Sequence, residues 1–288
     1  MKIKKYVLVG VVAIAVLAAG GVYYFARYKM PDRTGPAFPR AAERKSHVYK
    51  NPEQSIAKMK ILAFYAVPRN KTGHLESNWK NQLQAALDDA VKFHALQLKG
   101  TSELTYSIFQ EPVVLEKDDI FYDTEVTAAG NPRALVNVAE EIGRRVFEDG
   151  GDLYRPEFAT DDPAEYRVMG IVYEGVGAAG GIIYESPLET PEEIAEEIGV
   201  PRETVYIVEI EAIDAFFLVN RREYLAEEKL QLYGSSIFYH EFGHTLGLPD
   251  EYDAEDKIFS QDIMGGGRSK PFSRAYISRD FLRGMGVE

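Results

Sequence analysis

One segment constrains this chain more than any other: residues 238–252, with the sequence FYHEFGHTLGLPDEY. It contains His240 and His244, four residues apart, and Glu241 directly after the first histidine. On a helix this spacing puts both imidazoles on one face, where they can share one metal ion. A solvated or salt-bridged helix face can also carry such a motif by chance. We interpret the segment as a helix that carries a metal site.

The residues after His244 predict how such a site is completed. Gly247 stands where a helix that ends and reverses needs a residue tolerant of positive φ. The reversed chain brings Asp250 back toward the metal as a third ligand. Glu241 can then reach a metal-bound water and act as its general base. Two imidazoles, one carboxylate and an open water position are typical of a catalytic zinc site.

The sequence HEFGHTLGLPD resembles the metzincin zinc-peptidase signature HExxHxxGxxH, with Asp250 where most members have a third histidine. It is similar to the variant with an aspartate ligand in snapalysin-type bacterial peptidases. No histidine follows His244, so a third imidazole at the usual place is excluded. The resemblance implies Asp250 as the ligand, with Glu251, one residue off the pattern, as the second choice.

The resemblance also implies a Met-turn, a tight turn that places a methionine beneath the metal. The segment 262–267, DIMGGG, fits this turn with Met264, because its glycines indicate a turn rather than a helix. A single methionine can also fill a gap in a core. Tyr252 is a weak candidate for stabilising the oxyanion of a reaction, with a core or rim aromatic as the alternative.

An acidic stretch follows the metal motif. Its carboxylates could hold a structural calcium ion or form a solvated loop. The residues concerned are Asp253, Glu255, Asp256 and Asp262.

The composition excludes several function classes. The 288 residues suffice for one or two domains with a sizeable core. The formal net charge of −12 argues against nucleic acid as the main partner. The chain has no cysteine, which excludes disulfides and thiolate zinc ligands.

The N-terminus predicts a hydrophobic anchor. Residues 6–25 contain no charge and follow three lysines, and this length can just span a bilayer. A cleaved signal peptide is the alternative. We therefore expect an anchor or signal segment at 1–29, a linker at 30–55 and a catalytic domain at 56–288. The expected location is membrane-anchored with the catalytic domain outside the cytoplasm, or secreted if the segment is cleaved.

The remaining pattern predicts an α+β fold. Apolar runs at 60–67, 104–115, 167–173 and 205–212 indicate strands, and the stretches 77–98, 132–147 and 277–285 indicate helices. We interpret His94 in the first helix as a packed or solvated histidine and not a ligand. The resemblance implies a zincin or metzincin-like fold: a twisted mixed sheet with helices, an active-site helix, a Met-turn and a C-terminal helix. In that family an edge strand above the active-site helix pairs with substrate, and the glycine-rich stretch 175–184 is our candidate for it, with a plain surface hairpin as the alternative.

Together these features predict a zinc-dependent endopeptidase acting on a protein or peptide substrate. A catalytically silent binding protein of the same fold and a zinc hydrolase of a non-peptide substrate are the alternatives, because the motif chemistry specifies how water is activated and not which bond is cleaved.

Overall fold

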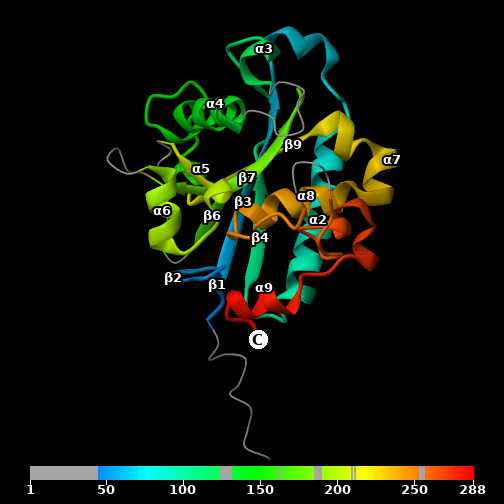
Figure 1. Ribbon diagram of the computed structural model, residues 1–288. Helices are drawn as coiled ribbons and strands as arrows, with labels where there is room; N and C mark the ends of the chain where they lie inside the picture. The colour runs from blue at the N-terminus through cyan, green and yellow to red at the C-terminus, as the bar shows by residue number, and fades with distance from the viewer. Residues whose placement is uncertain are drawn as a thin grey trace, which may run out of the picture. The chain divides into compact units, whose positions relative to one another are not determined.

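A twisted mixed sheet runs through the middle of the described part of the chain (Figure 1). The computed structural model describes residues 45–123, 132–160, 162–163, 165–184, 190–208, 210, 212–252 and 257–288. The strand order is β4-β3-β6-β9-β7-β8, and β5 also pairs with β3. The strands are β3 (Lys58–Val67), β4 (Glu103–Ile108), β5 (Val113–Val114), β6 (Tyr166–Tyr173), β7 (Ala178–Tyr184), β8 (Val205–Ile207) and β9 (Ala215–Asn220). Among these pairs only β7 with β9 is antiparallel, so the sheet is mostly parallel.

The central strands are apolar because both faces of the sheet are covered. All residues of β6 and β9 are buried, which is typical of strands inside a parallel sheet. Side chains alternate between two cores, as the two-residue period of a strand requires. In β3, for example, Ile61 and Ala63 belong to one core and Leu62 and Phe64 to the other.

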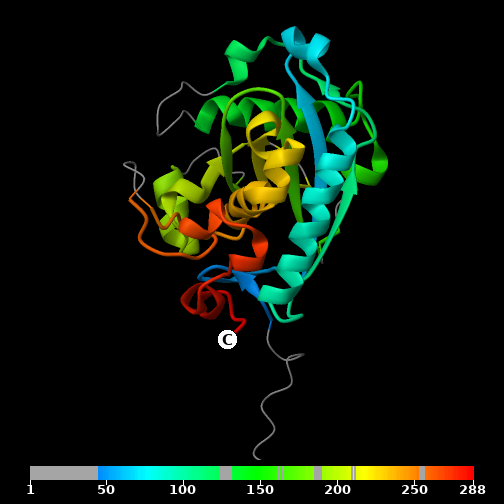
Figure 2. The ribbon, with the colours of Figure 1, turned by 90° about the vertical axis from the view of Figure 1, so that its right-hand side faces the viewer.

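Helices form a layer on each face of this sheet (Figures 1 and 2). The core that contains Ile61 also contains residues of α2 (Trp79–Gln97) and α8 (Ser235–His244). The opposite core contains residues of α4 (Pro132–Ile142) and α5 (Pro156–Ala159). The metal motif therefore lies on a helix packed against the sheet.

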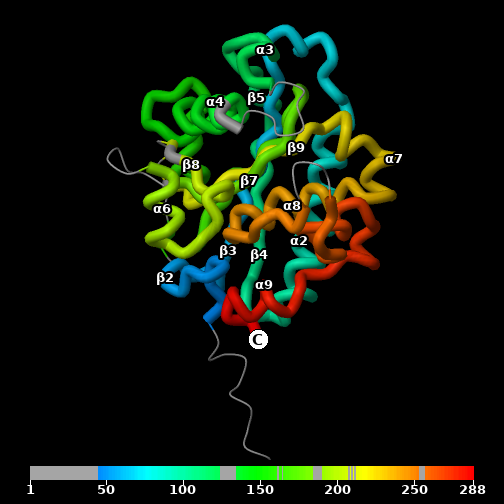
Figure 3. The backbone as a smooth tube through the Cα atoms, in the orientation of Figure 1, coloured from blue at the N-terminus to red at the C-terminus, as the bar shows by residue number. Residues whose placement is uncertain are grey.

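Short elements connect these layers. The helices are α3 (Asp119–Tyr122), α6 (Pro191–Ile198), α7 (Glu227–Lys229) and α9 (Arg279–Gly284). The 3₁₀ segments are η2 (Arg69–His74), η4 (Arg202–Thr204), η7 (Gly266–Ser269) and η8 (Phe272–Arg274). The π-helical segments are η3 (Gly143–Phe147), η5 (Arg221–Leu225) and η6 (Leu230–Gly234). Figure 3 shows the path from β9 through η5, α7 and η6 into α8.

An N-terminal hairpin, β1 (His47–Val48) with β2 (Asn51–Ser55), lies within the stretch predicted as a linker. The backbone N–H of Tyr49 donates to the carbonyl of Leu246, just after α8, at 2.8 Å. The N–H of Lys50 donates to the carbonyl of Gly284 in α9, also at 2.8 Å. The hairpin thus joins the C-terminal helix to the loop that follows the metal helix. The division at 30–55 and 56–288 stays a prediction.

The predicted fold class is confirmed: a twisted mixed sheet with helices, a helix at the metal motif and a C-terminal helix. The helix expected at 77–98 is α2. Its N-cap is Asn78. The strand expected at 104–115 is divided into β4 and β5.

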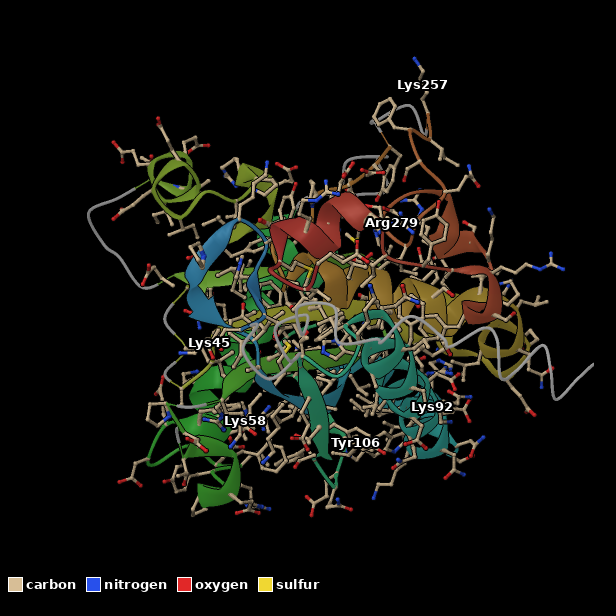
Figure 4. All side chains as sticks on the ribbon, turned by 90° about the horizontal axis from the view of Figure 1, so that it is seen from below. Lys45, Lys58, Lys92, Tyr106, Lys257 and Arg279 are labelled. Carbon is tan, nitrogen blue, oxygen red and sulfur yellow. The ribbon has the colours of Figure 1, made fainter. Side chains whose placement is uncertain are left out.

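The structure corrects the prediction of a transmembrane anchor. No helix among the described residues combines the length and the apolar character that crossing a bilayer requires. The longest of them, α2, carries Lys80, Asp88, Asp89 and Lys92, and Lys92 lies on its exposed side (Figure 4). The stretch 6–25, for which the span was predicted, lies outside the described residues. The predicted transmembrane helix, membrane partner and extracytoplasmic location are not retained.

His94 is a fully buried histidine that joins α2 to the metal helix. The Ser102 hydroxyl donates to the carbonyl of Ile56, so it accepts from Nε2–H of His94 at 2.8 Å. Nδ1 of His94 then accepts from the Tyr239 hydroxyl at 3.0 Å. The neutral form satisfies both ring nitrogens, and burial lowers the pKa of His94 to about 3.

We expect His94 to make the protein less stable in mild acid. The ordinary histidine pKa is 6.5, whereas the pKa of the folded protein's His94 is about 3. Below pH 6.5 the unfolded chain therefore takes up a proton that the folded protein does not. The free energy of unfolding falls with pH through this window, by about 2 kcal/mol between pH 7 and pH 5.

Urea unfolding at pH 7 and pH 5 tests this expectation. His94→Gln, which cannot titrate, should lose about 2 kcal/mol less than the wild type between the two pH values. His74→Gln, which changes an exposed histidine, should keep the wild-type pH dependence. Equal pH dependence in His94→Gln and the wild type would contradict the role of His94.

Candidate metal centre

The helix α8 is buried along its whole length and lies directly against β7. Gly180 of β7 allows this contact, because a Cβ there would lie 2.1 Å from the carbonyl oxygen of Glu241. The hydroxyl of Ser236 donates to the carbonyl of Lys270, and that of Ser235 to Asp89. These two serines connect the start of α8 to its neighbours.

The strand β7 has a strand on each side over part of its length. Residues 178–182 pair with β9, and residues 182–184 pair with β8. Among the described strands, β8 is therefore the outermost on this side. Within the glycine-rich stretch proposed as a substrate edge, residues 178–181 of β7 therefore have no paired strand among the described residues on the side of β8.

The end of α8 turns the chain back toward the helix. Gly247 has a φ of 75°, a conformation that glycine adopts without steric cost. The N–H of Leu248 donates to the carbonyl of Gly243 at 3.2 Å and closes the turn. A Cβ on Gly247 would lie 3.1 Å from side-chain carbons of both Val48 and Val200. The reversal carries Asp250 to the histidine face.

Three side chains meet at this face. Ligand atoms of His240, His244 and Asp250 all lie within 4.8 Å of one another. Oδ1 of Asp250 is 3.3 Å from Nε2 of His240 and 3.4 Å from Nε2 of His244. Among the described residues, no other such group was found.

The imidazole orientations are set by backbone carbonyls. Nδ1 of His240 lies 3.0 Å from the carbonyl oxygen of Ile263, and Nδ1 of His244 lies 2.9 Å from that of Leu248. A carbonyl only accepts, so each Nδ1 carries the hydrogen and each neutral ring presents a lone pair at Nε2. Oδ1 of Asp250 is buried and has no hydrogen-bond partner.

Three lone pairs that converge on one point would repel one another unless a cation lies among them. The alternative is a proton on one imidazole. Burial lowers the pKa of His244, but Asp250 and Glu241 raise it above its ordinary value. Burial raises the pKa of Asp250, but the two imidazoles hold it well below its usual range. Asp250 is thus an anion, and the donor set of two imidazoles and one carboxylate fits zinc.

Glu241 lies next to the first histidine and is 8 % exposed. Burial raises the pKa of its carboxyl, and the neighbouring His240 and His244 partly offset that effect. A carboxylate in such surroundings is a stronger proton acceptor than one in water.

Met264 is fully buried below the metal helix. A Cβ on Gly243 would lie 2.6 Å from its sulfur, so the glycine between the two histidines permits this contact. The N–H of Glu251 donates to the carbonyl of Met264 at 2.9 Å. The turn that contains Met264 therefore contacts both the helix and the segment that carries Asp250.

Tyr252 and Arg268 lie at the margin of the same site. The Tyr252 hydroxyl is 3.4 Å from Nε2 of His240. The guanidinium carbon of Arg268 lies 3.4 Å from the centre of the Tyr252 ring. Sequence reasoning named Tyr252 but missed Arg268, and the contact between residues so far apart in the sequence could not be inferred from spacing.

The calcium site considered for the acidic stretch finds no support among the described residues. Asp253, Glu255 and Asp256 lie outside the described residues. Asp262 is fully buried, and its Oδ1 accepts a hydrogen bond from the N–H of Met264 at 2.8 Å. It helps to shape the turn around Met264.

Comparison with known proteins adds little. No family model matches the sequence. No curated protein matches it. Among solved structures, the chain is similar to archaemetzincin from Methanopyrus kandleri, with 13% sequence identity over 80% of this chain and 96% of that chain, at a TM-score of 0.34. A likeness this distant decides nothing about activity, which has to be inferred from the site itself.

We expect Gly180→Ala to disturb the metal centre. Its Cβ would overlap the carbonyl oxygen of Glu241, so β7 and α8 would have to separate. The free energy of unfolding should fall by about 1–3 kcal/mol, and zinc affinity should fall with it. Denaturant unfolding and zinc titration measure both. Gly73→Ala is the control, because a Cβ there meets nothing within 4 Å. Equal behaviour of the two variants would contradict the tight contact.

Proposed function

We propose that this chain is a zinc-dependent endopeptidase. The observation that carries the proposal is the convergence of three ligand atoms, from His240, His244 and Asp250, on one point beside the buried carboxylate of Glu241. The resemblance of HEFGHTLGLPD to the metzincin signature supports it. The buried Met264 below the helix agrees with the Met-turn of that family.

The donor set favours zinc over harder cations. Imidazole nitrogens suit zinc and its neighbours, whereas calcium and magnesium prefer sites made of oxygen ligands. Three protein ligands leave a fourth tetrahedral position for water or substrate, as in catalytic rather than structural zinc sites. The carbonyls of Ile263 and Leu248 would keep the imidazoles oriented.

The chemistry follows from the residues around this position. When bound, zinc would lower the pKa of a water molecule toward neutrality and polarise the carbonyl of the peptide bond. Glu241 would accept the proton from that water and deliver it to the leaving amine. Tyr252, whose hydroxyl lies 3.4 Å from Nε2 of His240, would donate a hydrogen bond to the oxygen that becomes negative.

Two alternative functions compete with the proposed peptidase activity. The first is a catalytically silent binding protein, and the presence of Glu241 argues against it, because loss of the base is what would silence such a site. The second is a zinc hydrolase of a non-peptide substrate. Zinc-dependent cleavage of casein, an unstructured protein, would separate a peptidase from both.

We expect Asp250→Ala to weaken zinc binding by about 100-fold or more, since even residues behind a ligand typically contribute 10–100-fold. Glu251→Ala is the matched control and should bind zinc like the wild type. Asp250→His would restore a third imidazole and should retain zinc, if the loop accommodates the longer ring. Competition with a chromophoric chelator measures the affinities. Equal affinity in Asp250→Ala and the wild type would remove Asp250 from the ligand set.

We expect Glu241→Gln to retain zinc while casein cleavage falls by about 100- to 10,000-fold, because glutamine cannot accept the proton. Zinc titration and a fluorescent casein assay on the same preparation separate binding from chemistry. Near wild-type cleavage by this variant would refute the mechanism. Zinc binding by the wild type without any cleavage would favour the silent binding protein.

A further inference from the structure

The turn after Met264 brings one basic side chain to the metal centre. Three glycines follow the methionine. The N–H groups of Gly265 and Gly267 both donate to the carbonyl of Asp262, at 3.1 and 2.7 Å. A Cβ on Gly267 would lie 2.4 Å from that carbonyl oxygen, so the fold-back requires glycine there. The next residue is Arg268, within η7.

Arg268 contacts the face of Tyr252. At 3.4 Å from the guanidinium carbon to the ring centre, the two groups are in van der Waals contact in a cation–π arrangement. Such a contact holds the plane of the phenol ring. It also puts a positive charge next to the ring, because arginine stays protonated at every physiological pH.

The Tyr252 backbone is held independently of this contact. The N–H of Glu251 donates to the carbonyl of Met264, and Tyr252 itself forms a β-bridge with Ile258. These bonds fix the position of the Tyr252 backbone, but they leave the side chain free to rotate about χ1 and χ2. The cation–π contact with Arg268 restricts that rotation and keeps the hydroxyl near Nε2 of His240.

We propose that Arg268 is a positioning residue of the active site, which holds the Tyr252 ring so that its hydroxyl meets the oxyanion of the transition state. The inference rests on the proposed peptidase function and adds a residue to it. Arg268 does not touch the reacting atoms in this role. It acts through Tyr252, so its effect must vanish when the Tyr252 hydroxyl is removed.

The charges of the site give Arg268 a second effect in the same direction. Its guanidinium carries a positive charge directly against the Tyr252 ring. A cation against the phenol ring makes its hydroxyl a stronger hydrogen-bond donor to a developing negative charge.

A double-mutant cycle on the zinc-loaded protein tests the proposal. Tyr252→Phe should lower kcat for a fluorogenic peptide by about 10- to 100-fold with little change in KM, because the hydroxyl acts in the transition state. Arg268→Leu should lower kcat by a comparable factor. The double variant should be no slower than Tyr252→Phe alone, within about twofold.

Two single variants complete the design. Arg268→Lys keeps the cation but loses the planar group, and should recover part of the kcat lost in Arg268→Leu. Lys270→Ala removes a nearby cation whose ammonium group donates to Gln261 and not to Tyr252. Its kcat should match that of the wild type. Multiplied losses in the double variant, or wild-type kcat in Arg268→Leu, would overturn the proposal.

A measurement without catalysis separates this inference from the proposed function. In protein labelled with ¹³C on the tyrosine rings, the Tyr252 signal is identified by its loss in Tyr252→Phe. It should shift or broaden in Arg268→Leu and stay unchanged in Lys270→Ala. An unchanged signal in Arg268→Leu would overturn the positioning role. Failure of the wild type to cleave any peptide, with the signal shifted as expected, would instead contradict the peptidase function.

Discussion

The candidate metal centre depends on two hydrogen bonds made by the ring nitrogens that do not face the metal position. The carbonyls of Ile263 and Leu248 accept from Nδ1 of His240 and His244, and they thereby aim both Nε2 lone pairs at Asp250. One carbonyl belongs to the turn around Met264, and the other to the loop after α8. Both loops must therefore be folded against the helix for the site to form. The orientation of the two imidazoles depends directly on how these loops pack.

Close backbone packing makes that arrangement possible. Gly180 lets β7 touch α8 at Glu241, Gly243 leaves room for the sulfur of Met264, and Gly247 reverses the chain. A buried ion pair fixes the other end of the connection into α8. Arg221, directly after β9, donates two hydrogen bonds to the fully buried carboxylate of Glu174. Burial alone would raise the pKa of Glu174, but hydrogen bonds from Arg221, Arg222 and Tyr65 lower it. Breaking such a pair leaves an uncompensated charge, so it specifies where the chain leaves the sheet.

The sequence predicted those parts of the site that are local in the chain. His240 and His244 share a helix face by periodicity, and Asp250 follows after a turn whose glycine is visible in the sequence. The central strands were also predictable, because buried parallel strands are continuous apolar runs. Arg268 was not, since its partner Tyr252 lies beyond a separate turn. The pairing of β8 with half of β7 was missed for the same reason, because strand neighbours depend on tertiary packing.

The balance of charge gives a reason why a zinc site with a carboxylate ligand would gain from a nearby arginine. A zinc ion would bring two positive charges, which Asp250 and an ionised Glu241 would together cancel. A third imidazole in place of Asp250 would leave one positive charge to receive the oxyanion of a transition state. With Asp250 that charge would be missing, and in our proposal Arg268 compensates for it through Tyr252, whose ring it contacts. Arg268 is half-buried, so its charge would be screened less than that of a fully exposed arginine.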